Sequence, residues 1–188
     1  MIRRTAVLTV ILAAAFLVGC QSAPQPTANT GTENIDRNDG YSLLYDLVSD
    51  LKDVDKALIF RSKNAPFDDT IKAIAAMADA AHNQLDAFAK VDPGLQIKRQ
   101  PLPPIEVEVR KSISNSEAVG LFTSKGPIFN RRLLLSQQNG LQYAEHLAKV
   151  IQKHESVPKR KEFLASLEKQ AHNLREQVIT LLATPHAE

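Results

Sequence analysis

The sequence predicts an all-α fold, an up-and-down bundle of four main helices with a shorter fifth. Three observations lead to this prediction. Apolar residues recur at alternating spacings of three and four over long stretches, which is the pattern of helices that pack side by side along one seam. The stretch that alternates like a strand, residues 105–109, has no second strand to pair with, and an isolated strand is unstable. Only 5% of the residues are aromatic and none is tryptophan, so Leu, Ile, Val and Ala must build the core.

Two of the helices are predicted in the first half of the chain. The first spans residues 41–62, and its seam consists of Leu44, Leu47, Leu51, Val54 and Leu58. The second spans residues 66–91, and its unbroken seam consists of Phe67, Ile71, Ile74, Ala78, Ala81, Leu85 and Phe88. Pro66 suits a first helical turn, and Pro93-Gly94 ends the helix.

The other three helices are predicted in the second half. Residues 159–183 have a regular seam of Leu164, Leu167, Ala171, Leu174, Val178 and Leu181. Residues 128–154 have a seam of Phe129, Leu133, Gln137, Gly140, Ala144, Leu147 and Ile151. The residues in the middle of this seam are polar or small. They either permit a close approach of a neighbouring helix or leave room for another group, and close packing is the favoured interpretation. Residues 105–122 are assigned to the short fifth helix, before a break at Gly126-Pro127.

The N-terminal segment has the features of an export signal. Arg3 and Arg4 form a basic head, and residues 5–19 are an apolar run shorter than the roughly 20 residues of a membrane span. An uncleaved anchor helix is the alternative. The residues Leu17-Val18-Gly19-Cys20 resemble the lipobox of bacterial lipoprotein precursors. This resemblance is confined to the N-terminal segment, and it implies cleavage before Cys20, which becomes the acylated N-terminus.

The chain is therefore expected to have three parts: a signal peptide (1–19), a lipidated cysteine with a flexible tether (20–39), and a helical bundle domain (40–188). The segment after Cys20 is polar, and Ile35 is its one aliphatic residue, so it cannot bury enough apolar surface to fold. An ordered N-terminal arm is the alternative. Because Cys20 is the only cysteine, an intramolecular disulfide is excluded and the bundle depends on its core.

The lipoprotein resemblance implies a place in the cell envelope. In lipoproteins of Gram-negative bacteria an Asp after the lipidated Cys often directs retention in the inner membrane, so Gln21 favours the outer membrane, with the bundle facing the periplasm. The chain has 23 Lys+Arg and 21 Asp+Glu; loss of Arg3 and Arg4 with the signal lowers the first count to 21, so the formal charge becomes zero. The charge therefore gives no reason to expect nucleic-acid binding.

Acidic and histidine residues beside the seams are candidate metal ligands. They are Asp79, His82, Glu145, His146, Glu168 and His172. Carboxylates and imidazoles on facing helices bind iron, manganese or zinc in helical bundles. The layout weakly resembles ferritin-like bundles, in which two helices each carry Glu-x-x-His. The sequence departs from that pattern, because Asp79 stands in place of Glu, and Glu168 and His172 are four residues apart.

A basic corner is predicted between the helices at 128–154 and 159–183. It consists of Lys149, Lys153, Lys159, Arg160 and Lys161. Positive charge at the end of the first of these helices is favourable, whereas at the start of the next it opposes the helix dipole. Two interpretations stay open. One is a solvated turn, partly neutralised by Glu155 and Glu162; the other is a surface for anionic lipid headgroups or cell-wall carboxylates.

The sequence contains no phosphate-binding glycine loop, nucleophile elbow or cysteine-based metal motif. The predicted function is therefore non-catalytic: a membrane-anchored lipoprotein of the cell envelope with a binding or structural bundle and no cofactor. The alternative is a ferritin-like bundle that binds iron, manganese or zinc. The expected partners are the membrane, through the N-terminal lipid, and an envelope protein or cell-wall component. A homo-oligomer formed through surplus seam faces is a further alternative.

Overall fold

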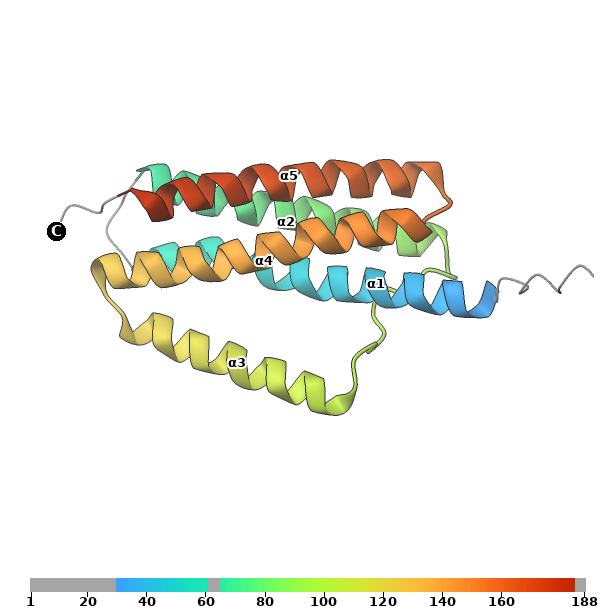
Figure 1. Cartoon of the computed structure of the whole chain (residues 1–188), viewed down its shortest axis with the longest axis horizontal. Coiled ribbons are helices and arrows are strands. Elements are labelled where there is room, and N and C mark those ends of the chain that lie inside the picture. Colours follow the sequence, from blue (N-terminus) through green and yellow to red (C-terminus); the bar gives the residue numbers. More distant parts are fainter. Residues whose placement is uncertain (1–29, 61–64, 185–188) are drawn as a thin grey trace, which may run out of the picture.

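The structure, a computed structural model, describes residues 30–60 and 65–184. These residues form five α-helices and one 3-10 helix, and they contain no strand, so the predicted all-α class is confirmed. The signal segment and Cys20 lie outside the described residues. The elements are α1 (Thr30–Leu51), η1 (Val54–Phe60), α2 (Ala65–Val91), α3 (Pro104–Thr123), α4 (Gly126–His154) and α5 (Pro158–Ala183) (Figure 1).

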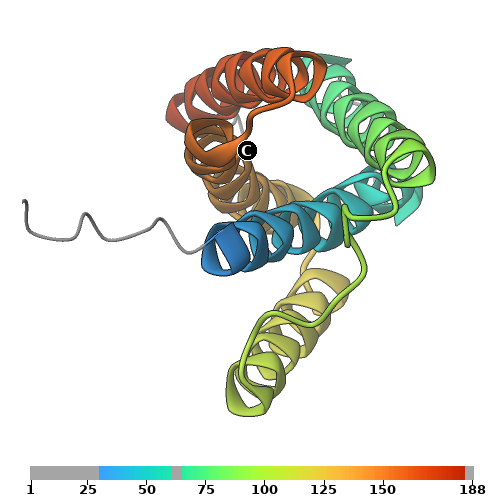
Figure 2. The same ribbon diagram turned by 90° about the vertical axis from the view of Figure 1, so that its right-hand side faces the viewer.

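Four helices enclose the core, and α3 lies outside them. In Figure 1, α1 and α5 run in one direction along a common axis, and α2 and α4 run in the opposite direction. Each of the four packs against two others: α4 against α5 and α1, and α2 against α1 and α5. The end-on view in Figure 2 shows this ring of four, with α3 standing off beside it. The main helices of the prediction are therefore α1, α2, α4 and α5, and the shorter fifth is α3.

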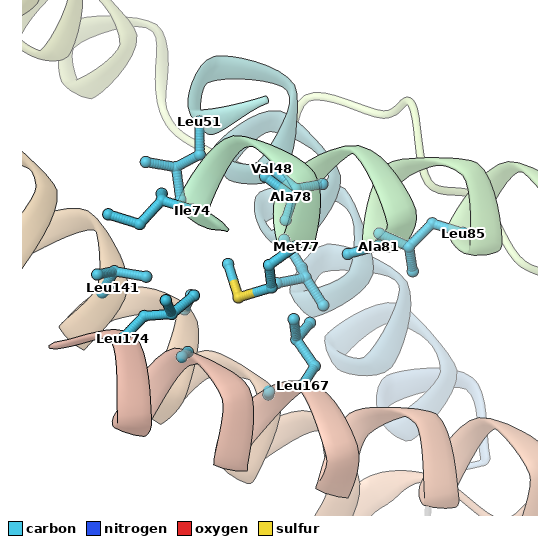
Figure 3. Packing of buried hydrophobic residues seen from close by; sticks show 14 of the residues in the cluster. Val48, Leu51, Ile74, Met77, Ala78, Ala81, Leu85, Leu141, Leu167 and Leu174 are labelled. Carbon is cyan, nitrogen blue, oxygen red and sulfur yellow. The ribbon is translucent and has the colours of Figure 1, made fainter. Parts of the chain in front are cut away.

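The seams predicted from the apolar spacing line the core. All seven seam residues of α2 are buried, and five of the six in α5 are buried, with Leu181 partly buried. Figure 3 shows Met77 of α2 pointing into the centre of the bundle, toward Leu167 and Leu174 of α5 and near Leu141 of α4. The core is thus continuous and apolar.

The helices α1 and α4 approach each other closely at two glycines. A Cβ atom at Gly40 would lie 2.8 Å from Cγ1 of Ile151, and one at Gly140 would lie 3.1 Å from Cδ2 of Leu51. Both distances are at or below the limit of ordinary carbon contacts, so a larger residue would push the helices apart. Close helix packing in the middle of α4, the favoured interpretation of its small residue, is confirmed at Gly140.

The prediction of one helix over residues 41–62 is wrong at its C-terminal end. α1 ends at Leu51, and Val54–Phe60 winds as a tighter 3-10 helix. The N–H of Lys56 donates to the carbonyl oxygen of Asp53, three residues earlier, and the two side chains form an ion pair at 2.8 Å. The apolar spacing could not reveal this change, because Leu58 is still partly buried against the core. Residues 61–64 lie outside the described part of the chain.

The predicted boundary between tether and bundle at residue 40 is too late. α1 begins at Thr30, inside the expected tether. Asn38 donates from Nδ2 to the carbonyl oxygen of Gly94 at 3.0 Å, and Asp39 forms an ion pair with Arg99 at 3.1 Å. The polar composition concealed this helical start, because the described contacts of Asn38 and Asp39 with the bundle are polar.

The short helix predicted at 105–122 is confirmed as α3, but it buries none of its side chains. Five of its large apolar residues are exposed, whereas Val107 and Leu121 are partly buried; the exposed ones are Ile105, Val109, Ile113, Val119 and Phe122. The chain turns from α3 into α4 through Gly126, whose φ of 55° lies in the left-handed region that favours glycine. The predicted break at this glycine therefore has a conformational cause.

A buried ion cluster joins the helix ends at the end of the bundle where α1 begins. Glu155, just after α4, accepts hydrogen bonds from the hydroxyl of Tyr41 (2.7 Å), the N–H of Val157 (2.7 Å) and Nε of Arg160 (2.9 Å). Arg160 also donates from Nη1 to Asp92, just after α2, at 2.6 Å. The side chains of Glu155 and Arg160 are 0% and 5% exposed. This cluster ties α1, the end of α2 and the α4–α5 turn together.

The hydrogen bonds of the cluster decide the charge of Glu155. Burial alone would raise the pKa of Glu155, but the hydrogen bonds from Tyr41, Val157 and Arg160 outweigh burial and hold this pKa below its usual range. Burial and the bond to Glu155 raise the pKa of Tyr41, which stays a neutral donor. A carboxyl group with a lower pKa in the folded chain contributes stability above its unfolded pKa, and this stability is lost as the pH falls through the folded pKa.

Replacing Glu155 by Gln should destabilise the protein strongly, because Arg160 would keep only one of its two carboxylate partners. We expect the free energy of unfolding in urea at pH 7 to fall by about 3 kcal/mol. Since Gln does not titrate, the loss of stability between about pH 5 and pH 2 should be smaller in the variant than in the wild type. The control Glu168→Gln removes a half-buried carboxylate 3.7 Å from Lys149 and should cost less than about 1 kcal/mol. Equal stability of the two variants would contradict a central role for the cluster.

Candidate functional site

A groove runs between α3 and the face formed by α1 and α4. It consists of three adjoining hollows of about 390, 460 and 190 Å³. Leu47, Asp50 and Arg110 line both the first and the second hollow, and Glu117 and Ser136 line both the second and the third. The hollows therefore form one continuous groove, which we call the α3 groove. It exists because α3 stands off from the other helices (Figure 2).

Much of the wall of the α3 groove is aliphatic. The apolar lining residues are Leu43, Leu47 and Leu51 of α1, Val107, Ile113 and Leu121 of α3, and Leu135 and Tyr143 of α4. Arg110 of α3 reaches toward α4, with its guanidinium carbon 5.8 Å from the centre of the Tyr143 ring, and its Nε donates to Glu106 at 2.8 Å. The charge of Arg110 is thus engaged with its own helix and with an aromatic ring.

Two carboxylates of α1 line the groove without partners. Asp46 and Asp50 are one helical turn apart, and neither accepts a hydrogen bond or forms an ion pair with any residue that the structure describes. Both residues are exposed to solvent, yet the walls of the groove partly desolvate their carboxyl groups, which raises the pKa of Asp46 and, together with the charge of Asp46, the pKa of Asp50. A like-charged pair at this spacing also destabilises a helix. The fold thus keeps two carboxylates where they lower its stability.

A buried amide lines the same groove. Gln137 of α4 is 5% exposed, and its Oε1 has no hydrogen-bond partner among the described residues. It lines the same hollow as Asp50. A buried acceptor without a donor lowers the stability of the fold by about 1–3 kcal/mol. A ligand N–H group that entered this hollow and donated to Gln137 would remove this loss of stability. Asp46, Asp50 and Gln137 together offer acceptor oxygens that suit an ammonium or guanidinium group.

These residues could be recognised only in part from the sequence. Asp46 and Asp50 are four residues apart beside the seam residues Leu47 and Leu51, and such a like-charged pair is locally unfavourable, which is a usable signal. Gln137 is visible as a polar residue in an apolar seam. The three residues border one groove only because of where α3 lies. The position of α3 cannot be predicted from the spacing of residues in the sequence.

The predicted metal ligands on α2 lie apart from those on α4 and α5. His82 stacks on the ring of Tyr45, with ring centres 4.5 Å apart, and its Nδ1 is 3.7 Å from a carboxylate oxygen of Asp86. Asp79 is exposed and accepts a hydrogen bond from a neighbouring asparagine of its own helix. His146 on α4 is exposed.

The remaining three predicted ligands are engaged in ion pairs between α4 and α5. Glu145 pairs with Arg175 at 2.9 Å and lies 3.3 Å from Nδ1 of His172, and Glu168 lies 3.7 Å from Lys149. Burial would raise the pKa of Glu145, but Arg175 and His172 lower it below its usual range. Within residues 30–60 and 65–184, no three His, Cys, Asp or Glu side chains are placed to share a metal ion. The six predicted ligands therefore do not form one site.

The predicted basic corner lies at the end of the bundle where α1 begins. Lys153 is in the last turn of α4, and Lys159 and Lys161 are in the first turn of α5; all three are exposed. Lys149 lies one turn before Lys153 and is near a carboxylate of α5. Arg160 does not contribute to this surface, because it is buried in the ion cluster. Lys159 and Lys161, which flank Arg160 in the sequence, remain as surface charges.

Comparison of the chain with family models, with curated proteins and with solved structures found no match. In the part of the chain that the structure describes, no helix combines the length and the apolar character that a membrane span needs. The α3 groove and the lipobox-like segment are thus the features from which a function can be inferred.

Replacing both groove carboxylates by amides should stabilise the fold at neutral pH. Because their pKa values are raised by folding, the ionised carboxylates lower stability once the pH exceeds the folded-state pKa, and Asn removes this cost. The melting temperature of Asp46→Asn/Asp50→Asn at pH 7, followed by circular dichroism, should exceed that of the wild type by roughly 1–3 °C. The gain should shrink near pH 3, where the wild-type carboxyls are protonated. The control Asp69→Asn/Asp79→Asn, on the exposed side of α2, should show no gain; a groove variant that melts below the wild type at pH 7 would contradict this account.

Proposed function

We propose that the protein is a lipid-anchored, non-catalytic binding bundle of the bacterial cell envelope. The lipobox-like residues Leu17-Val18-Gly19-Cys20, at the end of an export signal, support an anchor formed by acyl chains on Cys20. Gln21 favours the outer membrane, with the bundle in the periplasm. In this proposal the up-and-down bundle of α1, α2, α4 and α5 is the rigid scaffold on which α3 is displayed.

The α3 groove is the proposed binding site, and its ligand is a segment of an envelope protein that carries a Lys or Arg side chain among aliphatic ones. One observation carries this proposal: Asp46, Asp50 and Gln137 hold unpartnered acceptor oxygens in a groove with aliphatic walls. A cationic donor would form charge-assisted hydrogen bonds with the carboxylates and offset the cost of their partial burial. Aliphatic side chains of the same segment would cover Leu47 and Ile113.

The lining of the groove supports binding rather than turnover. Its aliphatic hydroxyl groups belong to Ser49, Ser114 and Ser136 and its phenolic hydroxyl belongs to Tyr143, and the described lining contains no imidazole or thiolate that could activate them. Ser49 donates instead to the carbonyl oxygen of Tyr45 in its own helix at 2.7 Å. The ferritin-like alternative lacks comparable support, because its six ligands lie on separate faces.

Replacing Cys20 by Ser should abolish the anchor, because serine does not provide the sulfur atom that carries an acyl chain. In cell fractionation the wild type should sediment with membranes, and mass spectrometry should find an acylated N-terminal cysteine. The Cys20→Ser variant should be released into the soluble fraction or accumulate as an uncleaved precursor. Gln21→Asp serves as a second variant, which should stay acylated and move to the inner-membrane fraction. Unchanged processing and membrane association of Cys20→Ser would contradict the proposed anchor.

Ligand recognition by the α3 groove can be measured with a defined probe. A fluorescent amphipathic peptide of leucine and lysine should bind more tightly than its leucine–glutamate counterpart, by fluorescence anisotropy. Asp46→Asn/Asp50→Asn should weaken binding of the lysine peptide about tenfold or more, because charge-assisted hydrogen bonds are lost. Binding by the wild type should also weaken as the pH falls through the raised pKa values of Asp46 and Asp50.

The matched control for this experiment is Asp69→Asn/Asp79→Asn, which removes the same charge from α2 and should leave the affinity unchanged. Equal affinity for the two peptides, or equal effects of the two double variants, would show that the groove carboxylates do not recognise a cation.

A further inference from the structure

The end of the bundle from which the N-terminal segment leaves carries a cluster of lysines, which we call the lysine end. It consists of Lys90 in the last turn of α2, Lys153 in the last turn of α4, and Lys159 and Lys161 in the first turn of α5. The ion cluster around Glu155 brings these helix ends together with the start of α1 (Figure 1). All four lysines are exposed, and none has a carboxylate partner among the described residues.

Three of the described carboxylates near the lysine end are already paired. Asp92 and Glu155 both bind Arg160, which is buried. Asp39 of α1 pairs with Arg99. Among the described side chains around the α4–α5 turn, Glu162 is the exposed carboxylate without a partner. Among the side chains that the structure describes, the solvent-facing charge of this end is therefore positive, although the mature chain is formally neutral.

Two of the lysines lie where positive charge is locally unfavourable. The N-terminus of a helix has a partial positive charge, so Lys159 and Lys161 oppose the dipole of α5. Arg160, between them, has a structural explanation in its ion pairs with the buried Glu155 and with Asp92. Lys159 and Lys161 contribute no such contact to the fold, and this points to an interaction with a negatively charged surface outside it.

The length of the preceding chain limits the distance between this end and a membrane. Cys20 is ten residues before Thr30, where α1 begins, and ten residues span at most about 36 Å when fully extended. With acyl chains on Cys20, Thr30 would thus lie within that reach of the bilayer surface, and the lysine end is the end of the bundle nearer to Thr30. The opposite end of the bundle is a further helix length away, about 39 Å for the 26 residues of α5.

We propose that the lysine end docks on anionic phospholipid headgroups, so that the bundle stands on the membrane with its helix axes along the membrane normal. The inference rests on the proposed lipid anchor for the position of the protein, but the charge complementarity is independent of the anchor. Each lysine near an anionic bilayer is expected to strengthen the partition coefficient about fivefold.

The test uses the chain from residue 21, without acyl groups, and vesicles of phosphatidylglycerol mixed with phosphatidylcholine or of phosphatidylcholine alone. The described core lies between Tyr41 and Val178, so this chain retains it, and circular dichroism checks folding. The protein should cosediment with the anionic vesicles and not with the neutral ones. Raising the NaCl concentration to about 0.5 M should release it, because salt screens exposed charges.

Charge reversal at the lysine end provides the matched comparison. Lys159→Glu/Lys161→Glu should lower the partition coefficient by about 25-fold or more, while its melting temperature should rise, because glutamates are favourable at a helix N-terminus. Unfolding therefore cannot account for the loss. The control Lys72→Glu/Lys125→Glu makes the same change in net charge at exposed positions near the opposite end of the bundle, and its binding should stay within about threefold of the wild type.

Equal binding to neutral and anionic vesicles, or equal losses in the two double variants, would overturn the proposal. Sedimentation with purified peptidoglycan but not with vesicles would also overturn it and assign the lysine end to cell-wall carboxylates. Because the chain in this test has no acyl groups, such a result is distinct from failure of the Cys20→Ser test. For the acylated protein in anionic vesicles, acetylation by an N-hydroxysuccinimide ester should be slower at Lys159 and Lys161 than at Lys72 and Lys125; equal rates would contradict docking.

Discussion

Glu155 can remain ionised inside the bundle only while donors from different parts of the chain reach its two oxygens. Tyr41 comes from α1, Val157 from the turn, and Arg160 from α5, and Arg160 in turn holds Asp92 at the end of α2. Apolar seams alone tolerate small slips of one helix along another, whereas hydrogen bonds have strict distances and directions. The cluster therefore sets the relative position of the four helices at this end, and with it the close approach of α1 and α4 that forms one wall of the α3 groove.

The parts of the fold that follow from local sequence periodicity could be predicted, and the parts that depend on distant partners could not. The seams of α2 and α5 repeat without interruption, and proline and glycine mark their ends, so their limits were predictable. In the sequence, Glu155 and Arg160 have the appearance of surface charges in a turn, because Asp92 is 68 residues from Arg160 and Tyr41 is 114 residues from Glu155. A charged side chain can be buried only beside a partner of opposite charge, and the spacing of residues along the sequence does not identify that partner.

The α3 groove shows the same limit for the candidate site. The apolar stripe of α3, with Val109 and Ile113, has a spacing similar to that of a buried seam, yet these residues are exposed. A periodic pattern reports which face a helix could bury, and not whether another element covers it. The stable ring of four helices supports a fifth that contributes little burial, so carboxylates beside it can lower stability without loss of the fold. In the proposed function, the recognition residues Asp46, Asp50 and Gln137 thus lie on helices of the ring itself, and α3 forms the other wall of the groove.

The position of the ion cluster next to the start of α1 also determines how the protein would respond to a mechanical pull on its N-terminus. A force applied at Thr30 would travel along α1 and load three of the described bonds, from Asn38 to Gly94, from Asp39 to Arg99 and from Tyr41 to Glu155. These bonds cross from α1 to neighbouring segments, so a pull along the helix axis would strain them together in shear rather than one by one. A pull on the N-terminus would therefore load these bonds together before the part of α1 that follows Asn38 could unravel.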